Sequence, residues 1–187
     1  MKKVFLLFIV SAAFCCVQAQ SKYPPVDKSP MDMSYYPNSY PVLKIQDKLT
    51  EPLMARVIFS RPQKNGRTIF GELLEYGKVW RLGANEATEI EFFQPARIGK
   101  TKVKKGRYTM YCIPYPDKWT VIINRDTDSW GAFKYDELKD VARIDVPVQK
   151  QAESLDSFVM NFEKATAGAN LIIAWDDIKV SVPITFL

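Results

Sequence analysis

Residues 106–124 read GRYTMYCIPYPDKWTVIIN, and this stretch carries the pattern that decides the fold. Side chains alternate between two faces on each side of the turn signal Pro116-Asp117. One face receives Tyr108, Met110, Cys112, Trp119, Val121 and Ile123, and the other receives Arg107, Thr109, Tyr111, Thr120, Ile122 and Asn124. Successive side chains of a strand point to opposite faces of a sheet, so the stretch predicts two strands separated by a turn.

The same period of two recurs from Met54 to the C-terminus. It is found within residues 55–59, 88–92, 142–146, 158–162, 171–175 and 178–184. Turn signals separate the runs at Asn65-Gly66, Lys105-Gly106, Trp130-Gly131 and Ala167-Gly168, and Asp176-Asp177 is expected to form a tight hairpin between the last two strands. Residues 135–141 are expected to form a short helical turn, and residues 149–155 a polar connection. The sequence thus predicts an all-β fold, an antiparallel β-sandwich of about eight to ten strands, with a jelly-roll as one arrangement.

The N-terminal residues have the pattern of a targeting signal. Lys2 and Lys3 precede the apolar run 4–10, and Val17-Gln18-Ala19 offers a cleavage site. The run is too short to span a bilayer, so residues 1–19 are expected to be a cleaved signal peptide that directs the protein to the periplasm or outside. Lipid attachment at Cys15 or Cys16 is the alternative. Residues 20–53 are expected to be an extended, Pro- and Tyr-rich lead-in, and residues 54–187 the β-sandwich domain.

Composition excludes several classes of site. The chain has no histidine, which rules out Ser-His-Asp and Cys-His catalysis and removes the commonest ligand of zinc. Cys112 is therefore expected to be a small core residue. Asp126 and Asp128 are interpreted as a solvated turn, so no metal and no cofactor are expected. The net charge of +5 is spread along the chain without a concentrated basic face, so no nucleic-acid partner is expected.

One segment does not follow the strand pattern, because residues 61–88 combine glycine, aromatic, arginine and amide side chains. Its motifs are SRP at 60–62, GR at 66–67, IFG at 69–71, YG at 76–77, VWR at 79–81 and GANEAT at 83–88. Downstream follow GRY at 106–108, IP at 113–114, WTV at 119–121, IN at 123–124 and WG at 130–131, with Tyr135, Asp140 and Arg143.

Together these motifs resemble the domain-of-unknown-function 2911 family over roughly residue 54 to the C-terminus. The resemblance implies an exported protein of Bacteroidota-type bacteria and implies no particular activity. The chain departs from the family pattern at Glu75, where proline is common, and at Leu82, where threonine is common.

Residues 61–88 admit two interpretations. In the structural one, Arg81 and Glu86 form an ion pair across a turn, Asn85 adopts a left-handed conformation, and Trp80 packs with its indole N–H bonded. Arg67 and Arg143 would pair with Asp140 or Glu72, and the segment would be a covered loop that crosses one end of the sandwich. In the functional one, the same residues line a pocket. The candidate ligand-binding residues are then Arg81, Asn85, Glu86, Trp80, Asn124 and Trp130.

Three functions follow from these interpretations. The main hypothesis is a non-catalytic binding module for a small polar ligand, glycan or peptide. The alternative is a carboxylate-dependent, glycosidase-like hydrolase that uses Glu86 with Glu72 or Asp140. The third hypothesis is a structural or interaction protein of the cell envelope.

Overall fold

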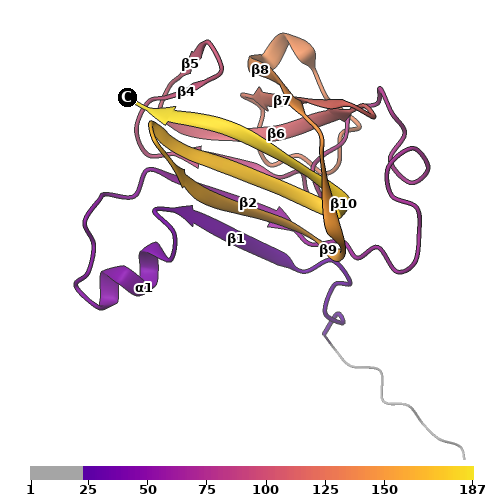
Figure 1. The fold of residues 1–187 in the computed structure, drawn as a ribbon, viewed down its shortest axis with the longest axis horizontal. Coiled ribbons are helices and arrows are strands. Elements are labelled where there is room, and N and C mark those ends of the chain that lie inside the picture. The colour runs from indigo at the N-terminus through magenta and orange to yellow at the C-terminus, as the bar shows by residue number, and fades with distance from the viewer. Residues whose placement is uncertain (1–22) are drawn as a thin grey trace, which may run out of the picture.

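Within residues 23–187, ten strands form two antiparallel sheets that pack face to face (Figure 1). The structure is a computed structural model that describes residues 23–187. The predicted all-β, antiparallel β-sandwich is confirmed. The expected signal peptide at 1–19 and the cysteines Cys15 and Cys16 lie outside the described residues.

The larger sheet has six strands in the order β1-β2-β3-β6-β7-β8. Their bounds are Met31–Tyr36 (β1), Ala55–Ser60 (β2), Glu89–Phe92 (β3), Gly106–Pro114 (β6), Lys118–Asn124 (β7) and Asp140–Pro147 (β8). At its centre, β6 and β7 pair with Met110 opposite Ile123 and Cys112 opposite Val121. This register places the apolar sets predicted from residues 106–124 on one common face.

The smaller sheet has four strands in the order β5-β4-β10-β9. Their bounds are Ala96–Ile98 (β4), Thr101–Val103 (β5), Gln149–Ala165 (β9) and Gly168–Phe186 (β10). The long strands β9 and β10 form one hairpin whose turn lies between Ala165 and Gly168, where the Ala167-Gly168 signal predicted it.

Two local expectations for this hairpin are wrong. Asp176 and Asp177 do not form a turn but lie inside β10, where the pairing with β9 shifts register around Asp176. Residues 149–155, expected to be a polar connection, are part of β9. Lysine side chains bind the carboxylates of Asp176 and Asp177, so the strand tolerates two acids that in isolation favour a turn.

The helices are short. The expected helical turn is present as the 3-10 helix η1 (Glu137–Lys139), whose N-cap Asp136 accepts a hydrogen bond from the amide of Leu138. The segment expected to be an extended lead-in contains β1 and one helix, α1 (Tyr40–Ile45). Its prolines disfavour helix, but Pro41 lies in the first turn of α1, where the missing N–H costs nothing.

Aromatic side chains from both sheets meet between them. Trp80 packs against Trp119 of the larger sheet and against Phe158 and Trp175 of the smaller one. Cys112 is fully buried in the same core, and burial raises the pKa of its thiol well above the ordinary value. The core role predicted for Cys112 is therefore confirmed.

A second, smaller apolar cluster lies on the opposite face of the larger sheet. Ala87, Tyr111 and Ile122 are buried there, and Val79, Ile113, Ala132 and Tyr135 pack around them. Tyr111 and Ile122 belong to β6 and β7, but they alternate with the residues that face the main core. The cluster therefore anchors the segments around Ala87 and Ala132 onto the outer face of the sheet.

Among residues 23–187, no helix has the length and apolar character that a membrane span requires.

Candidate functional site

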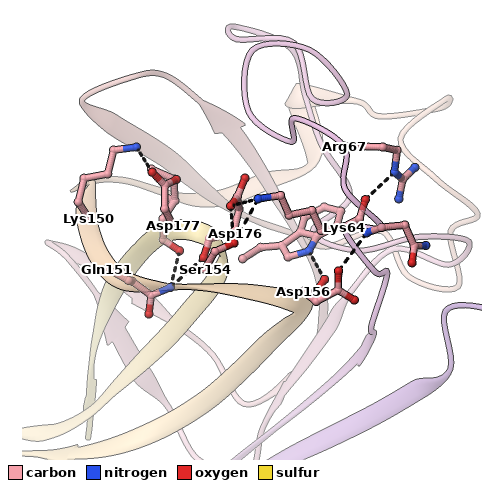
Figure 2. A network of polar contacts seen from close by, with 11 residues as sticks. Lys64, Arg67, Lys150, Gln151, Ser154, Asp156, Asp176 and Asp177 are labelled. Atoms are coloured by element: carbon pink, nitrogen blue, oxygen red, sulfur yellow. Dashed lines mark hydrogen bonds and ion pairs between the residues drawn. The ribbon is translucent and has the colours of Figure 1, made fainter.

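After β2 the chain crosses from the larger sheet to the edge of the smaller one. The amide of Phe158 donates to the carbonyl of Pro62 at 2.9 Å, and the amide of Lys64 donates to the carbonyl of Asp156 at 2.6 Å. Figure 2 shows Lys64 reaching the carboxylate of Asp176, which also accepts a hydrogen bond from Ser154. Residues 62–64 therefore cover the edge of β9, but most of residues 63–79 are exposed, so this part of the segment is not the covered loop that the structural interpretation expected.

Residues 81–88 form a tight loop beside β6. Trp80 forms an isolated antiparallel β-bridge with Cys112 of β6. The chain leaves the larger sheet after Trp80 and rejoins it at β3. Inside the loop, the amide of Thr88 donates to the carbonyl of Arg81 at 3.0 Å, and Trp80 Nε1 donates to the carbonyl of Gly83 at 3.1 Å. The indole bond of Trp80 thus matches the structural interpretation.

Two non-glycine residues of this loop have left-handed backbone. Leu82 has φ 54° and Asn85 has φ 57°. Such a conformation is common for asparagine and rare for a bulky apolar residue. The left-handed conformation predicted for Asn85 is confirmed, and the buried side chain of Leu82 compensates for the unfavourable backbone by packing in the main core.

The ion pairs expected around the 61–88 segment are only partly present. Arg143 pairs with Asp140 at 2.7 Å, as predicted. Arg67 bonds instead to backbone carbonyls of Gln63 and Lys64. The pair between Arg81 and Glu86 is not formed, and Nε of Arg81 is buried without a hydrogen-bond partner. The loop is closed by backbone bonds, so it does not need the charge pair.

A cleft lies where residues 126–134 cross the outer face of the larger sheet. Its volume is about 470 Å³, and its lining is Tyr111, Asp126, Thr127, Asp128, Ser129, Trp130, Gly131, Phe133 and Lys134. Trp130 is 62% exposed and Phe133 is 84% exposed, whereas Tyr111 is 2% exposed. We call this hollow the Trp130 cleft.

The 81–88 loop supports one side of the Trp130 cleft through its backbone. Gly131 donates its amide to the carbonyl of Asn85 at 2.9 Å, and Ala87 donates its amide to the carbonyl of Ser129 at 2.9 Å. Glu86 and Trp130 form an antiparallel bridge between these two bonds. The 61–88 segment thus contributes to the cleft by positioning Trp130.

A buried polar network supports the other side of the Trp130 cleft. The side-chain amide of Asn124 donates to Asp140 Oδ1 at 2.7 Å and to the carbonyl of Asp136 at 2.9 Å. Tyr135 donates its hydroxyl to Asp140 Oδ2 at 2.7 Å, and Arg143 bonds both Asp140 and Tyr135. Burial and the hydrogen bond with Asp140 raise the pKa of Tyr135 above its ordinary value. These bonds fix the segment that carries Trp130 and Phe133.

The six candidate residues therefore lie at different places. Trp130 lines the cleft, and Asn85 and Glu86 adjoin it through the backbone. Glu86 also lines a neighbouring hollow of about 170 Å³. Arg81 lines a separate hollow of about 190 Å³. Trp80 lines the same hollow as Arg81, but it is buried and its indole N–H is bonded within the loop. Asn124 is buried, and its side chain is bonded within the fold.

Sequence reasoning missed the other residues of the cleft. Phe133, Ser129 and Lys134 were not singled out, and Asp126 and Asp128 were interpreted as a solvated turn. Two aromatic residues, Trp130 and Phe133, flank Gly131 inside a polar turn, and this placement of large aromatic side chains was the available signal.

The carboxylates near the cleft are paired. Asp128 pairs with Arg107, and Asp126 pairs with Lys139 at 3.1 Å. Asp140 accepts bonds from Asn124, Tyr135 and Arg143 and is almost fully buried. In the part of the chain that the structure describes, no group of three potential metal-ligating side chains comes together.

A family model described as Protein of unknown function (DUF2911) matches residues 43–184. The match covers strands β2 to β9 and almost all of β10, together with both loops that form the Trp130 cleft. Neither a curated protein nor a solved structure gives a significant match to the chain.

Proposed function

This chain belongs to the DUF2911 family, and we propose that it binds, without catalysis, a small polar ligand that contains a ring, such as a sugar unit of a glycan. The exposed indole of Trp130 at the Trp130 cleft carries the proposal. A peptide with a ring-bearing side chain is the other ligand that the cleft would suit. An exported chain would meet such ligands in the periplasm or outside the cell.

The chemistry of the cleft supports a ligand with both apolar and polar faces. Trp130 and Phe133 offer large aromatic surfaces, which stack on flat apolar faces such as that of a sugar ring. Ser129, Lys134 and the acids at the rim offer donors and acceptors for hydroxyl groups. Small-molecule sites commonly measure about 300–1,000 Å³ and combine an apolar lining with a few polar groups. The volume of about 470 Å³ lies in that range.

The rigidity of the cleft also supports binding. The backbone bonds of Ser129 and Gly131 hold one side, and the Asn124 network holds the other. A binding surface that is already ordered loses little conformational entropy when the ligand arrives. The residues that line the Trp130 cleft are therefore held in a fixed arrangement, which favours a ligand-binding site over a solvated turn.

The hydrolase alternative has weaker support. A glycosidase needs two available carboxyl groups about 5–10 Å apart. Asp140, one partner proposed for Glu86, is enclosed by three donors and serves the fold. Glu72 and Glu86 are both exposed, and neither lines the Trp130 cleft. We therefore favour binding over hydrolysis.

The test uses the fluorescence of Trp130. Of the four tryptophans, Trp80, Trp119 and Trp175 are buried, so a collisional quencher such as acrylamide reaches Trp130 selectively. The purified protein is titrated with disaccharides, N-acetylated amino sugars and aromatic dipeptides. A ligand that occupies the cleft should protect Trp130 from the quencher and should bind in calorimetry.

The matched variants are Trp130→Ala, inside the cleft, and Tyr115→Ala, an exposed aromatic residue outside it. Binding should be lost in the first variant and kept in the second. The proposal is wrong if Trp130→Ala binds every positive ligand as well as the unchanged protein does. It is also wrong if no compound of these classes protects Trp130.

A further inference from the structure

Arg81 is a cation without a partner. Within residues 23–187 its side chain forms no ion pair and no hydrogen bond, and its Nε is buried. Arg56 makes the contrast clear, because its Nε is buried too but its guanidinium pairs with Glu91 at 2.6 Å. Buried polar groups in folded proteins nearly always have a partner, so each exception calls for an explanation.

Arg81 lines a hollow of about 190 Å³ that is separate from the Trp130 cleft. Its apolar lining comes from Leu73, Leu74, Val79, Trp80 and Ala132. Ala132 belongs to the segment whose neighbours Gly131 and Phe133 line the cleft, so this segment divides the two hollows. We call the second hollow the Arg81 pocket.

The charges of the Arg81 pocket favour an anion. Lys78 adds a second positive charge and Glu75 a negative one, which leaves one positive charge in excess. Desolvation of the guanidinium lowers the pKa of Arg81, so its charged form is less stable here than in water. A bound anion would give the guanidinium of Arg81 the ion-pair and hydrogen-bond partner that the fold does not supply.

We propose that the Arg81 pocket binds the carboxylate of a small organic molecule, with its apolar part against Leu74 and Ala132. The planar guanidinium matches a carboxylate in geometry, and the single excess charge matches a monoanion. The pocket is smaller than the roughly 300–1,000 Å³ of ordinary ligand sites, so it admits a small acid or only the end of a longer chain. Two sources share this chemistry: a free short-chain acid and the C-terminal carboxylate of a peptide.

Calorimetry with matched probes tests the ligand class. The probes are hexanoate, its neutral analogue hexanamide, the dipeptide Ala-Leu, the same dipeptide with an amidated C-terminus, and inorganic phosphate. Hexanoate, Ala-Leu or both should bind, and the neutral partners should not. Binding of hexanoate alone identifies a free acid as the source, and binding of Ala-Leu alone identifies a peptide end. Equal binding of the neutral analogues, stronger binding of phosphate, or no binding of either carboxylate would overturn the proposal.

Variants locate the binding. Arg81→Met should weaken carboxylate binding roughly 10- to 100-fold, the effect of losing a hydrogen bond between charged groups. Arg97→Met removes an exposed arginine from β4 and should leave binding unchanged. Trp130→Ala should also leave it unchanged, which separates this site from the proposed function of the cleft. Lys78→Gln, at an exposed position, should weaken binding several-fold and serves as the test if Arg81→Met does not fold. Full binding in both Arg81→Met and Lys78→Gln would contradict the assignment.

Discussion

The side-chain nitrogen of Asn124 donates a hydrogen bond to Oδ1 of Asp140 at 2.7 Å, which ties the last residue of β7 to the first residue of β8. The same nitrogen donates to the carbonyl of Asp136, and Oδ1 of Asn124 accepts from the amide of Asp126 at 2.9 Å. One buried side chain thus holds both ends of the segment that carries Trp130 and Phe133. The shape of the Trp130 cleft depends on these bonds.

Asn124→Ala should therefore destabilise the protein by about 2–3 kcal/mol, because it removes three part-buried hydrogen bonds and leaves the amide of Asp126 and Oδ1 of Asp140 without a partner. Urea unfolding measures the loss, and hydrogen exchange should show faster exchange in residues 126–136. Thr120→Ala, a change on the same strand that removes one exposed hydrogen bond, should cost less than about 1 kcal/mol. Equal losses in the two variants would refute the special role of Asn124.

Tyr135 should make the stability fall at alkaline pH. Burial and the bond with Asp140 raise its pKa, so the folded protein keeps a phenolic proton that the unfolded chain loses above about pH 10. The contribution is complete below pH 10 and is lost as the pH rises further, since the unfolded state then binds fewer protons. In urea unfolding between pH 8 and 11, Tyr135→Phe should lose stability less steeply than the unchanged protein. Burial also raises the pKa of Tyr111, so some slope should remain. Identical slopes would contradict the assignment.

The sandwich could be predicted because apolar alternation is a local property. Met110 and Ile123 lie on the same face of their strands whatever the rest of the chain does, and the structure pairs them directly. Asp176 and Asp177 were misread because their partners are distant in sequence. Lys64 lies 112 residues from Asp176, and Lys150 lies 27 residues from Asp177. A local sequence pattern cannot reveal that distant lysines neutralise these two carboxylates.

The site could be predicted only in part for the same reason. The sequence identified Trp80 and Trp130 as aromatic residues near glycines but could not tell which one is buried. The environment of Trp80 comes from Phe158 and Trp175, which lie 78 and 95 residues later in the sequence. Arg81 was expected to pair with Glu86 because they are close in sequence, but the loop between them closes through backbone bonds instead.

Substitution of Gly83 should destabilise the protein because Gly83 packs closely against Ser60 of β2. A Cβ at this residue would lie 2.6 Å from Oγ of Ser60, and the backbone has φ 155°. Ser60 also bonds both backbone groups of Ala84, so it has no room to move aside. Gly83→Ala should cost several kcal/mol, as overpacking adds to lost hydrogen bonds. At Gly66, where a Cβ would meet no atom within 4 Å, the same change should cost only the backbone strain of about 1 kcal/mol. Thermal unfolding of the two variants distinguishes these cases, and equal melting temperatures would contradict the steric argument.

The protein should lose stability in acid when Asp176, at the register shift between β9 and β10, becomes protonated. Burial alone would raise the pKa of Asp176, but the hydrogen bonds from Lys64 and Ser154 outweigh it and hold the pKa below its ordinary 3.8 (Figure 2). The stabilisation is therefore present above about pH 4 and is lost as the pH falls through the lower folded value. Asp176→Asn should cost about 1–2 kcal/mol at pH 7 and should show a shallower loss of stability between pH 5 and 2. Asp177→Asn removes the exposed pair with Lys150 and should change stability by less than about 0.5 kcal/mol at pH 7. Urea unfolding between pH 5 and 2 tests this prediction. If Asp176→Asn loses stability with falling pH as steeply as the unchanged protein, the register shift does not depend on the charge of the carboxylate.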